Sequence, residues 1–220
     1  MMEEAKFNQL CSHYKDTFDI HRASIKQRDT LFYALLLTLA VFTLQFSSVE
    51  VVTSIVTEYV QKSTGVKLGQ NTDFMSTLLW FVILGFSTRY FQVVLEIERQ
   101  YGYLHKLEAT LNNQYDDEYS FTREGKSYLS KYPLFSNWVW LLYTLFFPSI
   151  LLFVIIARIK FQVSTMESIE INQIIDFICY LIVGTSTVLY TYRLHEEAVL
   201  KSTGAVWDKI KSIKYVRSGA

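Results

Sequence analysis

Residues 74–95 read FMSTLLWFVILGFSTRYFQVVL, and this stretch decides the fold class. It holds one ionisable residue, Arg89, and no proline. As an α-helix rising about 1.5 Å per residue, its 22 residues would be roughly 33 Å long. The hydrocarbon core of a bilayer is about 30 Å thick. We therefore predict that this stretch is a transmembrane helix.

Three more apolar blocks, at 31–52, 136–158 and 171–192, are separated by strongly charged segments. The first is the weakest, because its apolar run ends at Phe46 and needs the following serines to reach the far side of a bilayer. Pro148 is expected to kink the third block. Half of the chain is apolar and only two residues are prolines, which excludes a disordered chain. The prediction is an all-α integral membrane protein with four transmembrane helices.

The distribution of lysine and arginine predicts the orientation. Segment 1–30 holds five of these residues, segment 96–135 holds five, and segment 193–220 holds six. The two connections on the other side hold only Lys62, Lys67, Arg158 and Lys160. Because cytoplasmic loops carry the excess of positive charge, both termini are expected in the cytoplasm.

The three basic segments also carry apolar residues at three- and four-residue steps, which is typical of amphipathic helices. Few glycines or prolines interrupt the joins to the apolar blocks. We expect segments 1–30, 96–135 and 193–220 to continue the first, second and fourth spans as a cytoplasmic helical bundle or stalk.

Arg89 and Asp176 are the ionisable residues that this reading places well inside a span, where charges commonly mark function. Their expected depths differ by roughly 15 Å, so they should not pair. Arg89 could instead extend to inner-leaflet phosphates, and Asp176 could be an ordinary residue at the start of a helix.

Block 171–192 has the most polar face, which suggests a pore-lining helix in an oligomer, with an acidic ring at its mouth. The alternative is close packing between helices, for which small and hydroxyl residues are also typical. The residues on this stripe are Asp176, Tyr180, Gly184, Thr187 and Thr191.

Basic residues cluster after the last block and in the central cytoplasmic segment, where they would meet anionic lipid or a phosphate-bearing ligand. They are Lys209, Lys211, Lys214, Arg217, Arg123 and Lys126. The sequence contains no P-loop, GxSxG, HExxH or cysteine–histidine zinc spacing. We therefore expect no catalysis, no metal and no cofactor.

A leading helix from His13-Tyr14 to Arg28-Asp29 enters the first hairpin, and long cytoplasmic helices follow. This layout resembles the small membrane effectors of bacterial anti-phage systems, including SLATT-like and four-span effectors. The resemblance implies a homo-oligomer of the bacterial inner membrane that forms an ion channel or pore when a cytoplasmic protein or nucleotide signal releases it. The alternative is a non-conducting membrane-anchored sensor or scaffold that recruits a soluble partner.

Overall fold

The computed structural model describes residues 2–47, 49–65, 72–115, 134–165 and 171–218, and within the last of these ranges it describes side chains as far as Glu196. The described chain contains helices and no strand, which confirms the all-α prediction. In chain order the elements are α1 (Met2–Ser47), α2 (Val49–Thr64), α3 (Thr72–Tyr115), α5 (Leu134–Leu141), the π-helix η1 (Leu142–Phe146), α6 (Phe147–Thr165) and α7 (Ile171–Ser218).

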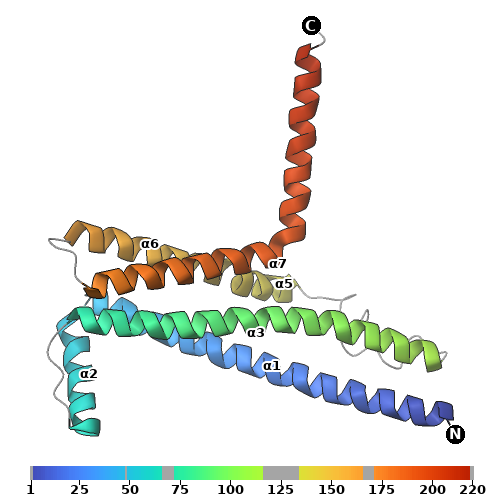
Figure 1. The fold of residues 1–220 in the computed structure, drawn as a ribbon, viewed down its shortest axis with the longest axis horizontal. Helices are drawn as coiled ribbons and strands as arrows, with labels where there is room; N and C mark the ends of the chain where they lie inside the picture. Colours follow the sequence, from blue (N-terminus) through green and yellow to red (C-terminus); the bar gives the residue numbers. More distant parts are fainter. Residues whose placement is uncertain (1, 48, 66–71, 116–133, 166–170, 219–220) are drawn as a thin grey trace.

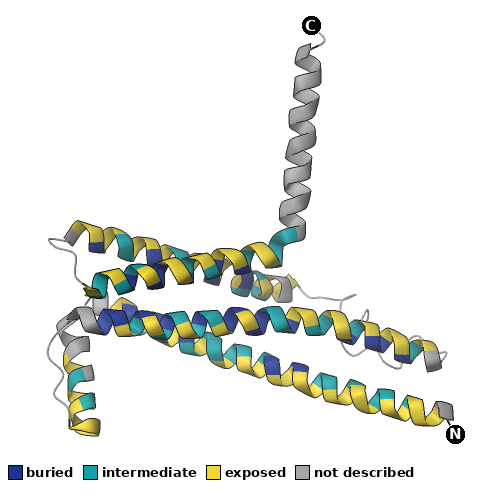
Figure 2. Cartoon of the chain, in the orientation of Figure 1, coloured by how far each residue is buried: buried dark blue, intermediate teal, exposed yellow. Residues whose placement is uncertain are grey.

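Helix α3 lies at the centre of the molecule, with α1 on one side and α7 on the other (Figure 1). Helix α6 packs against α7, and α1 runs alongside α3 for most of its length. The buried side chains form a row along the facing surfaces of these helices (Figure 2). The core at the end nearest α2 includes Leu35, Phe42, Trp80, Ile83 and Val183.

Three helical stretches within the described residues are long and apolar enough to cross a membrane. They are Met75–Asn113, Trp138–Ser164 and Ile171–Glu196. These stretches contain the second, third and fourth predicted spans, except for residues 74, 136 and 137. The sequence had predicted four, and the first predicted span, 31–52, is not among them.

The prediction of one helix across 31–52 is wrong, because α1 ends at Ser47 and α2 begins at Val49. Helix α2 leaves the end of the bundle in a direction that crosses those of α1 and α3 (Figure 1). The apolar run is therefore divided between two helices that point in different directions.

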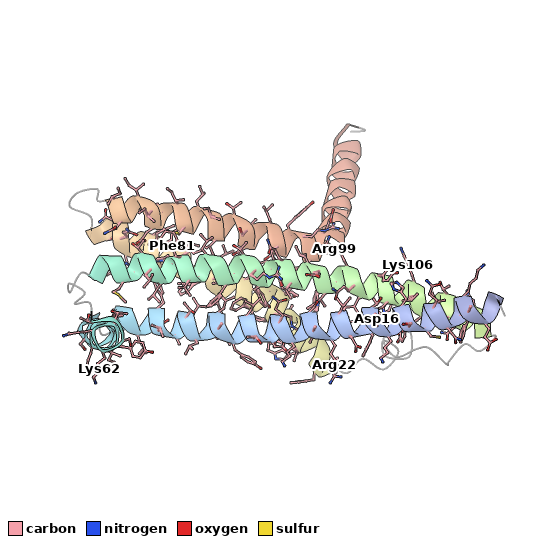
Figure 3. All side chains as sticks on the ribbon, turned by 60° about the horizontal axis from the view of Figure 1, so that its bottom comes forward. Asp16, Arg22, Lys62, Phe81, Arg99 and Lys106 are labelled. Carbon is pink, nitrogen blue, oxygen red and sulfur yellow. The ribbon has the colours of Figure 1, made fainter. Side chains whose placement is uncertain are left out.

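Large apolar side chains are exposed around the four helices that run side by side. Examples are Leu37 on α1, Phe81 on α3, Phe153 on α6 and Leu181 on α7, and Phe81 is labelled in Figure 3. In water such a surface would be unfavourable, whereas in a bilayer it meets hydrocarbon. The arrangement supports a membrane protein.

Pro148 is preceded by the π-helix η1, in which the N–H of Phe147 donates to the carbonyl oxygen of Leu142. In the same register the carbonyl of Tyr143 would face position 148, where proline has no N–H to offer. The hydroxyl of Tyr190 donates to that carbonyl oxygen instead, at 3.4 Å. Pro148 was expected to kink the third span. At this place the structure has a π-helical turn, and the free carbonyl accepts a hydrogen bond from Tyr190 on α7.

Candidate functional site

A cluster of polar and charged side chains lies between α3, α6 and α7, at the end of the bundle nearest α2. We call it the outer polar cluster and define it as Ser76, Arg158, Gln162, Asp176 and Tyr180. The Nη2 group of Arg158 donates to the Oγ of Ser76 at 2.7 Å. The hydroxyl of Tyr180 donates to the Oε1 of Gln162 at 2.8 Å. Polar groups on three different helices are thus joined across the interior.

The cluster is enclosed by the bundle. Asp176 is 3% exposed, Tyr180 is 2% exposed, and Ser76 and Gln162 are also buried. Asp176 is buried one helical turn before Tyr180 on α7, and Arg158 is half-buried on α6. An acidic and a basic side chain therefore both lie within the candidate membrane spans. Ionisable side chains in such positions are costly and commonly mark ion or proton pathways.

Aromatic rings separate the outer polar cluster from α1. Trp80 packs edge-on against Tyr180, with ring centroids 4.5 Å apart, and against Phe42 at 5.1 Å. The guanidinium of Arg158 lies 5.9 Å from the centroid of the Phe42 ring. Rings at this distance stabilise a cation whose surroundings exclude water.

Sequence reasoning missed Arg158, which it assigned to the connection after the third span. Helix α6 continues to Thr165, and Arg158 is half-buried with its guanidinium directed at α3. Apolar residues do continue beyond it, at Ile159, Phe161 and Val163. These residues indicated that the span continues past Arg158. The charges of Arg158 and Lys160 nevertheless led to the prediction that the span ends there.

The predicted stripe on α7 faces the interior of this one chain. Asp176, Tyr180 and Thr187 are buried, while Gly184 and Thr191 are half-buried. A Cβ atom added at Gly184 would lie 3.9 Å from the Cδ1 of Ile155 on α6, so the glycine lies in the contact between these helices.

The two threonines of the stripe bond to their own helix. Thr187 donates to the carbonyl oxygen of Val183 at 2.7 Å, and Thr191 donates to that of Thr187 at 2.9 Å. Within the single chain, only Asp176 and Tyr180 of the stripe belong to the outer polar cluster. Of the other three, Gly184 lies in a contact between helices, as the close-packing alternative requires, and the two threonines bond within α7.

A second cluster, made of aromatic side chains, fills the interior closer to the cytoplasmic end predicted for the spans. We call it the inner aromatic cluster; its members are Phe32, Tyr90, Phe91, Tyr143, Phe147 and Tyr190. The rings of Phe91 and Tyr190 stack at 4.3 Å, and those of Phe32 and Tyr143 meet edge-on at 4.7 Å. Tyr190 is 2% exposed, so its ring belongs to the interior of the bundle.

Beyond the inner aromatic cluster, polar groups join α1 to α3. The Nδ1 of His21, which is buried, donates to the Oε1 of Gln100 at 3.1 Å. The hydroxyl of Tyr14 donates to the Oε1 of Glu108, also buried, at 2.9 Å. Charged side chains such as Asp16 and Lys106 point outward from this part of the pair (Figure 3). We call this portion, 2–29 with 96–115, the stalk.

Arg89 does not meet Asp176. It is exposed, and its guanidinium approaches the side-chain oxygens of Gln27 and Gln92 at 3.5 Å. This position favours the interpretation that Arg89 extends to the membrane surface. Of the predicted basic residues, Arg123 and Lys126 lie outside the described residues. Lys209, Lys211, Lys214 and Arg217 belong to α7, but their side chains lie beyond those described.

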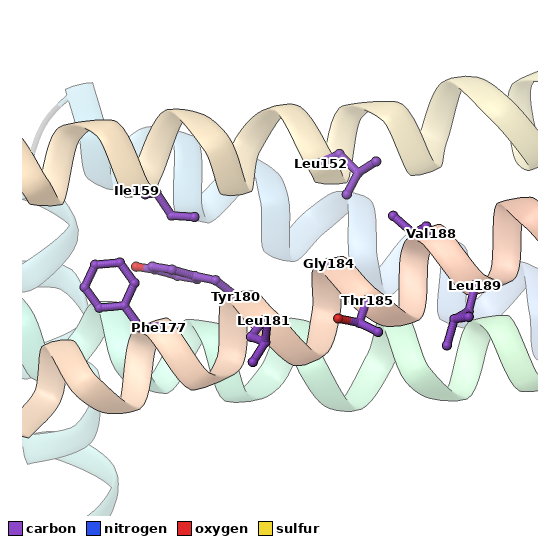
Figure 4. Close-up of a pocket in the computed structure, with 9 residues that line it drawn as sticks. All are labelled: Leu152, Ile159, Phe177, Tyr180, Leu181, Gly184, Thr185, Val188 and Leu189. Carbon is purple, nitrogen blue, oxygen red and sulfur yellow. The ribbon is translucent and has the colours of Figure 1, made fainter.

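A groove of about 550 Å³ lies between α6 and α7 (Figure 4). Leu152 and Ile159 line one side, and Leu181, Gly184 and Val188 line the other. Since this lining is largely apolar, the groove suits hydrocarbon better than an ion. No group of histidine, cysteine, aspartate and glutamate that could hold a metal occurs among the described side chains.

Comparison with known proteins found no matching family, no matching characterised sequence and no matching solved structure. The function must therefore be argued from the geometry.

Proposed function

We propose that the chain is a four-span membrane protein that assembles as a homo-oligomer and conducts ions under control of its cytoplasmic stalk. The observation that carries this proposal is the set of polar and charged side chains in the outer polar cluster, where Asp176 is buried and Arg158 donates to Ser76. Two groups of opposite charge inside a membrane bundle cost free energy unless they are compensated, and a purely structural core avoids them. An ion path needs such groups, because they replace part of the hydration shell.

The distribution of buried residues supports a closed conformation. Between Asp176 and the stalk, the interior is filled by Ile83, Val183 and the inner aromatic cluster. An apolar constriction of this kind blocks ions by excluding water. Opening would then require the helices to separate at the inner aromatic cluster.

The continuity of α1 and α3 supports control from the cytoplasm. Each runs without interruption from the stalk into the membrane bundle. The guanidinium of Arg28, at the join, lies 5.3 Å from the centroid of the Tyr143 ring. A displacement of the stalk would therefore act directly on the inner aromatic cluster.

Residues 31–44 of α1 supply the fourth span in this proposal. They are apolar on both faces, with Leu35, Leu39 and Phe42 buried and Leu37 and Leu44 exposed. A helix that is apolar all round belongs in the core of a protein or in a membrane. With α1 crossing, its amino terminus lies on the same side as the carboxyl end of α3, which agrees with the charge distribution.

The test is ion flux into liposomes that contain the purified protein. Val183 is fully buried between the two clusters, whereas Val188 on the same helix faces outward. We expect Val183→Ser to raise the basal flux at least tenfold by wetting the constriction, and Val188→Ser to leave it unchanged. Adding Asp176→Asn to Val183→Ser should lower the flux again. Equal flux in both serine variants would contradict the proposed path.

The second candidate function is a membrane-anchored sensor that conducts nothing and recruits a soluble protein through its stalk. The bonds of Thr187 and Thr191 to their own helix favour it, because these hydroxyls are satisfied within the helix without any ion. Folded protein without flux in any variant would select this function. A setting in anti-phage defence in the bacterial inner membrane rests on the resemblance in helix order. Phage challenge of cells with and without Asp176→Asn tests that setting.

A further inference from the structure

Helix α2 has a position that neither the ion path nor the stalk explains. It starts two residues after α1 ends and runs across the direction of the bundle, and Figure 3 shows it end-on with its residue Lys62 labelled. The same end of the bundle carries the end of α6 and the beginning of α7 (Figure 1). In the proposed topology this is the outer surface of the membrane.

The two sides of α2 differ in chemistry. Ile55 and Tyr59 lie one helical turn apart and both have large, mainly apolar side chains. They are nevertheless 61% and 73% exposed. Ser54 and Gln61 are exposed on the other side, and Val60 is half-buried. Helical spacing gathers the valines, Ile55 and Tyr59 on one side of α2, with Lys62 at its edge, and places both glutamates and Gln61 on the other side.

We propose that α2 lies flat in the outer lipid–water interface, with Ile55 and Tyr59 inserted among the acyl chains. This inference rests on the proposed membrane topology. The apolar face of α2 continues the lipid-facing surface of the bundle, which has the exposed side chains of Leu44 and Leu78 near the same end. Tyrosine is favoured at this depth, because its ring is apolar and its hydroxyl reaches water.

The charges on α2 indicate how it binds lipid. The Nζ of Lys62 lies 3.1 Å from the Oε1 of Glu58, so these two exposed charges form an ion pair. The helix has one other charged residue, Glu50, and no cluster of basic residues. Anionic lipid would therefore add little, and insertion of the apolar face must supply the affinity.

The interfacial position also accounts for the short first span. From Leu31 to Ser47, α1 has 17 residues, which is about 26 Å of helix and less than the roughly 30 Å of a bilayer core. A helix that lies in the interface from Val49 onward fixes the outer end of this span. A short span is then accommodated by local thinning of the bilayer rather than by a longer helix.

The experiment is electron paramagnetic resonance of spin labels on single cysteines in vesicles, with Cys11→Ser and Cys179→Ala as the background. Labels go at Ile55→Cys and Tyr59→Cys, and the matched controls are Ser54→Cys and Gln61→Cys. We expect collisions with oxygen to dominate at 55 and 59, and collisions with a water-soluble nickel complex to dominate at 54 and 61. The pattern should be the same with and without anionic lipid.

Nickel accessibility at all four sites would overturn the inference, and shielding of 55 and 59 from both probes would assign that face to protein. A requirement for anionic lipid would also contradict it. The topology is tested separately with a membrane-impermeant maleimide on intact cells, using Lys62→Cys and Lys106→Cys. Labelling of 62 alone supports the orientation, whereas labelling of 106 alone refutes the topology without deciding whether α2 enters lipid.

Discussion

Replacing Tyr180 by phenylalanine removes one oxygen atom from the outer polar cluster and should destabilise the fold. The lost hydroxyl donates to the Oε1 of Gln162 on α6 at 2.8 Å. Tyr180 is 2% exposed and Gln162 is also buried, so bulk water cannot take the place of the hydroxyl. Removing one partner of a buried hydrogen bond costs about 1–3 kcal/mol, with charged partners at the upper end.

The measurement is equilibrium unfolding in mixed micelles by titration with sodium dodecyl sulfate. Fluorescence is a suitable signal, because the Trp80 ring lies 4.5 Å from that of Tyr180. The matched control is Tyr192→Phe, a half-exposed tyrosine on the same helix, which should change the free energy of unfolding by less than about 0.5 kcal/mol.

A double-mutant cycle with Gln162→Leu separates this bond from general packing. Coupling of about 0.5–2 kcal/mol is expected, since the double variant leaves no unsatisfied partner behind. If the two single effects simply add, or if Tyr180→Phe matches Tyr192→Phe, the bond does not stabilise the bundle and the reasoning about the outer polar cluster fails.

Three further predictions use the same unfolding assay. Tyr190→Phe should lower the free energy of unfolding by about 0.5 kcal/mol, less than Tyr180→Phe, because the bond of Tyr190 to the Tyr143 carbonyl is long at 3.4 Å. An equal or greater loss would show that this bond contributes more to the stability of η1. Tyr14→Phe should lower the free energy of unfolding by about 1–3 kcal/mol, because it leaves the buried Glu108 without this hydrogen bond. Tyr33→Phe, at an exposed position on the same helix, should have no effect. Equal effects would show that the Tyr14–Glu108 bond does not stabilise the fold. Gly184→Leu should lower the free energy of unfolding by about 1–3 kcal/mol, because the new side chain would overpack against Ile155. Gly85→Leu should be tolerated, since nothing lies within 4 Å of a Cβ atom at that position. A larger loss for Gly85→Leu would contradict the α6–α7 contact.

The sequence was sufficient for the helices but not for their inward faces. Hydropathy located three of the candidate spans and the long continuous helices, because a bilayer demands about 20 apolar residues whatever the partner helices are. It could not say that Tyr190 is buried and Tyr192 is half-exposed, since lipid is as apolar as the protein interior. The same ambiguity allowed the α7 stripe to be interpreted as pore-lining.

The division of the first predicted span into α1 and α2 and the position of Arg158 were missed for a different reason. No glycine or proline marks residue 48, and the apolar spacing continues from α1 into α2, so periodicity alone predicts a single helix. Arg158 was placed by its charge, although its partner Ser76 lies 82 positions away in the sequence. Such pairings follow from tertiary packing and cannot be derived from local patterns.

The π-helix η1 has a consequence for how the third span tolerates changes in length. A turn with i→i+5 bonding holds one more residue than an α-helical turn of the same rise. Deleting one residue within 142–146 would therefore return the segment to α-helical bonding while α5 and α6 keep their facing surfaces. The same deletion within 149–160 would rotate everything on one side of it by about 100°. The π-helical turn thus contains one residue more than an α-helical turn would need, and deletion of one residue is expected to be tolerated there.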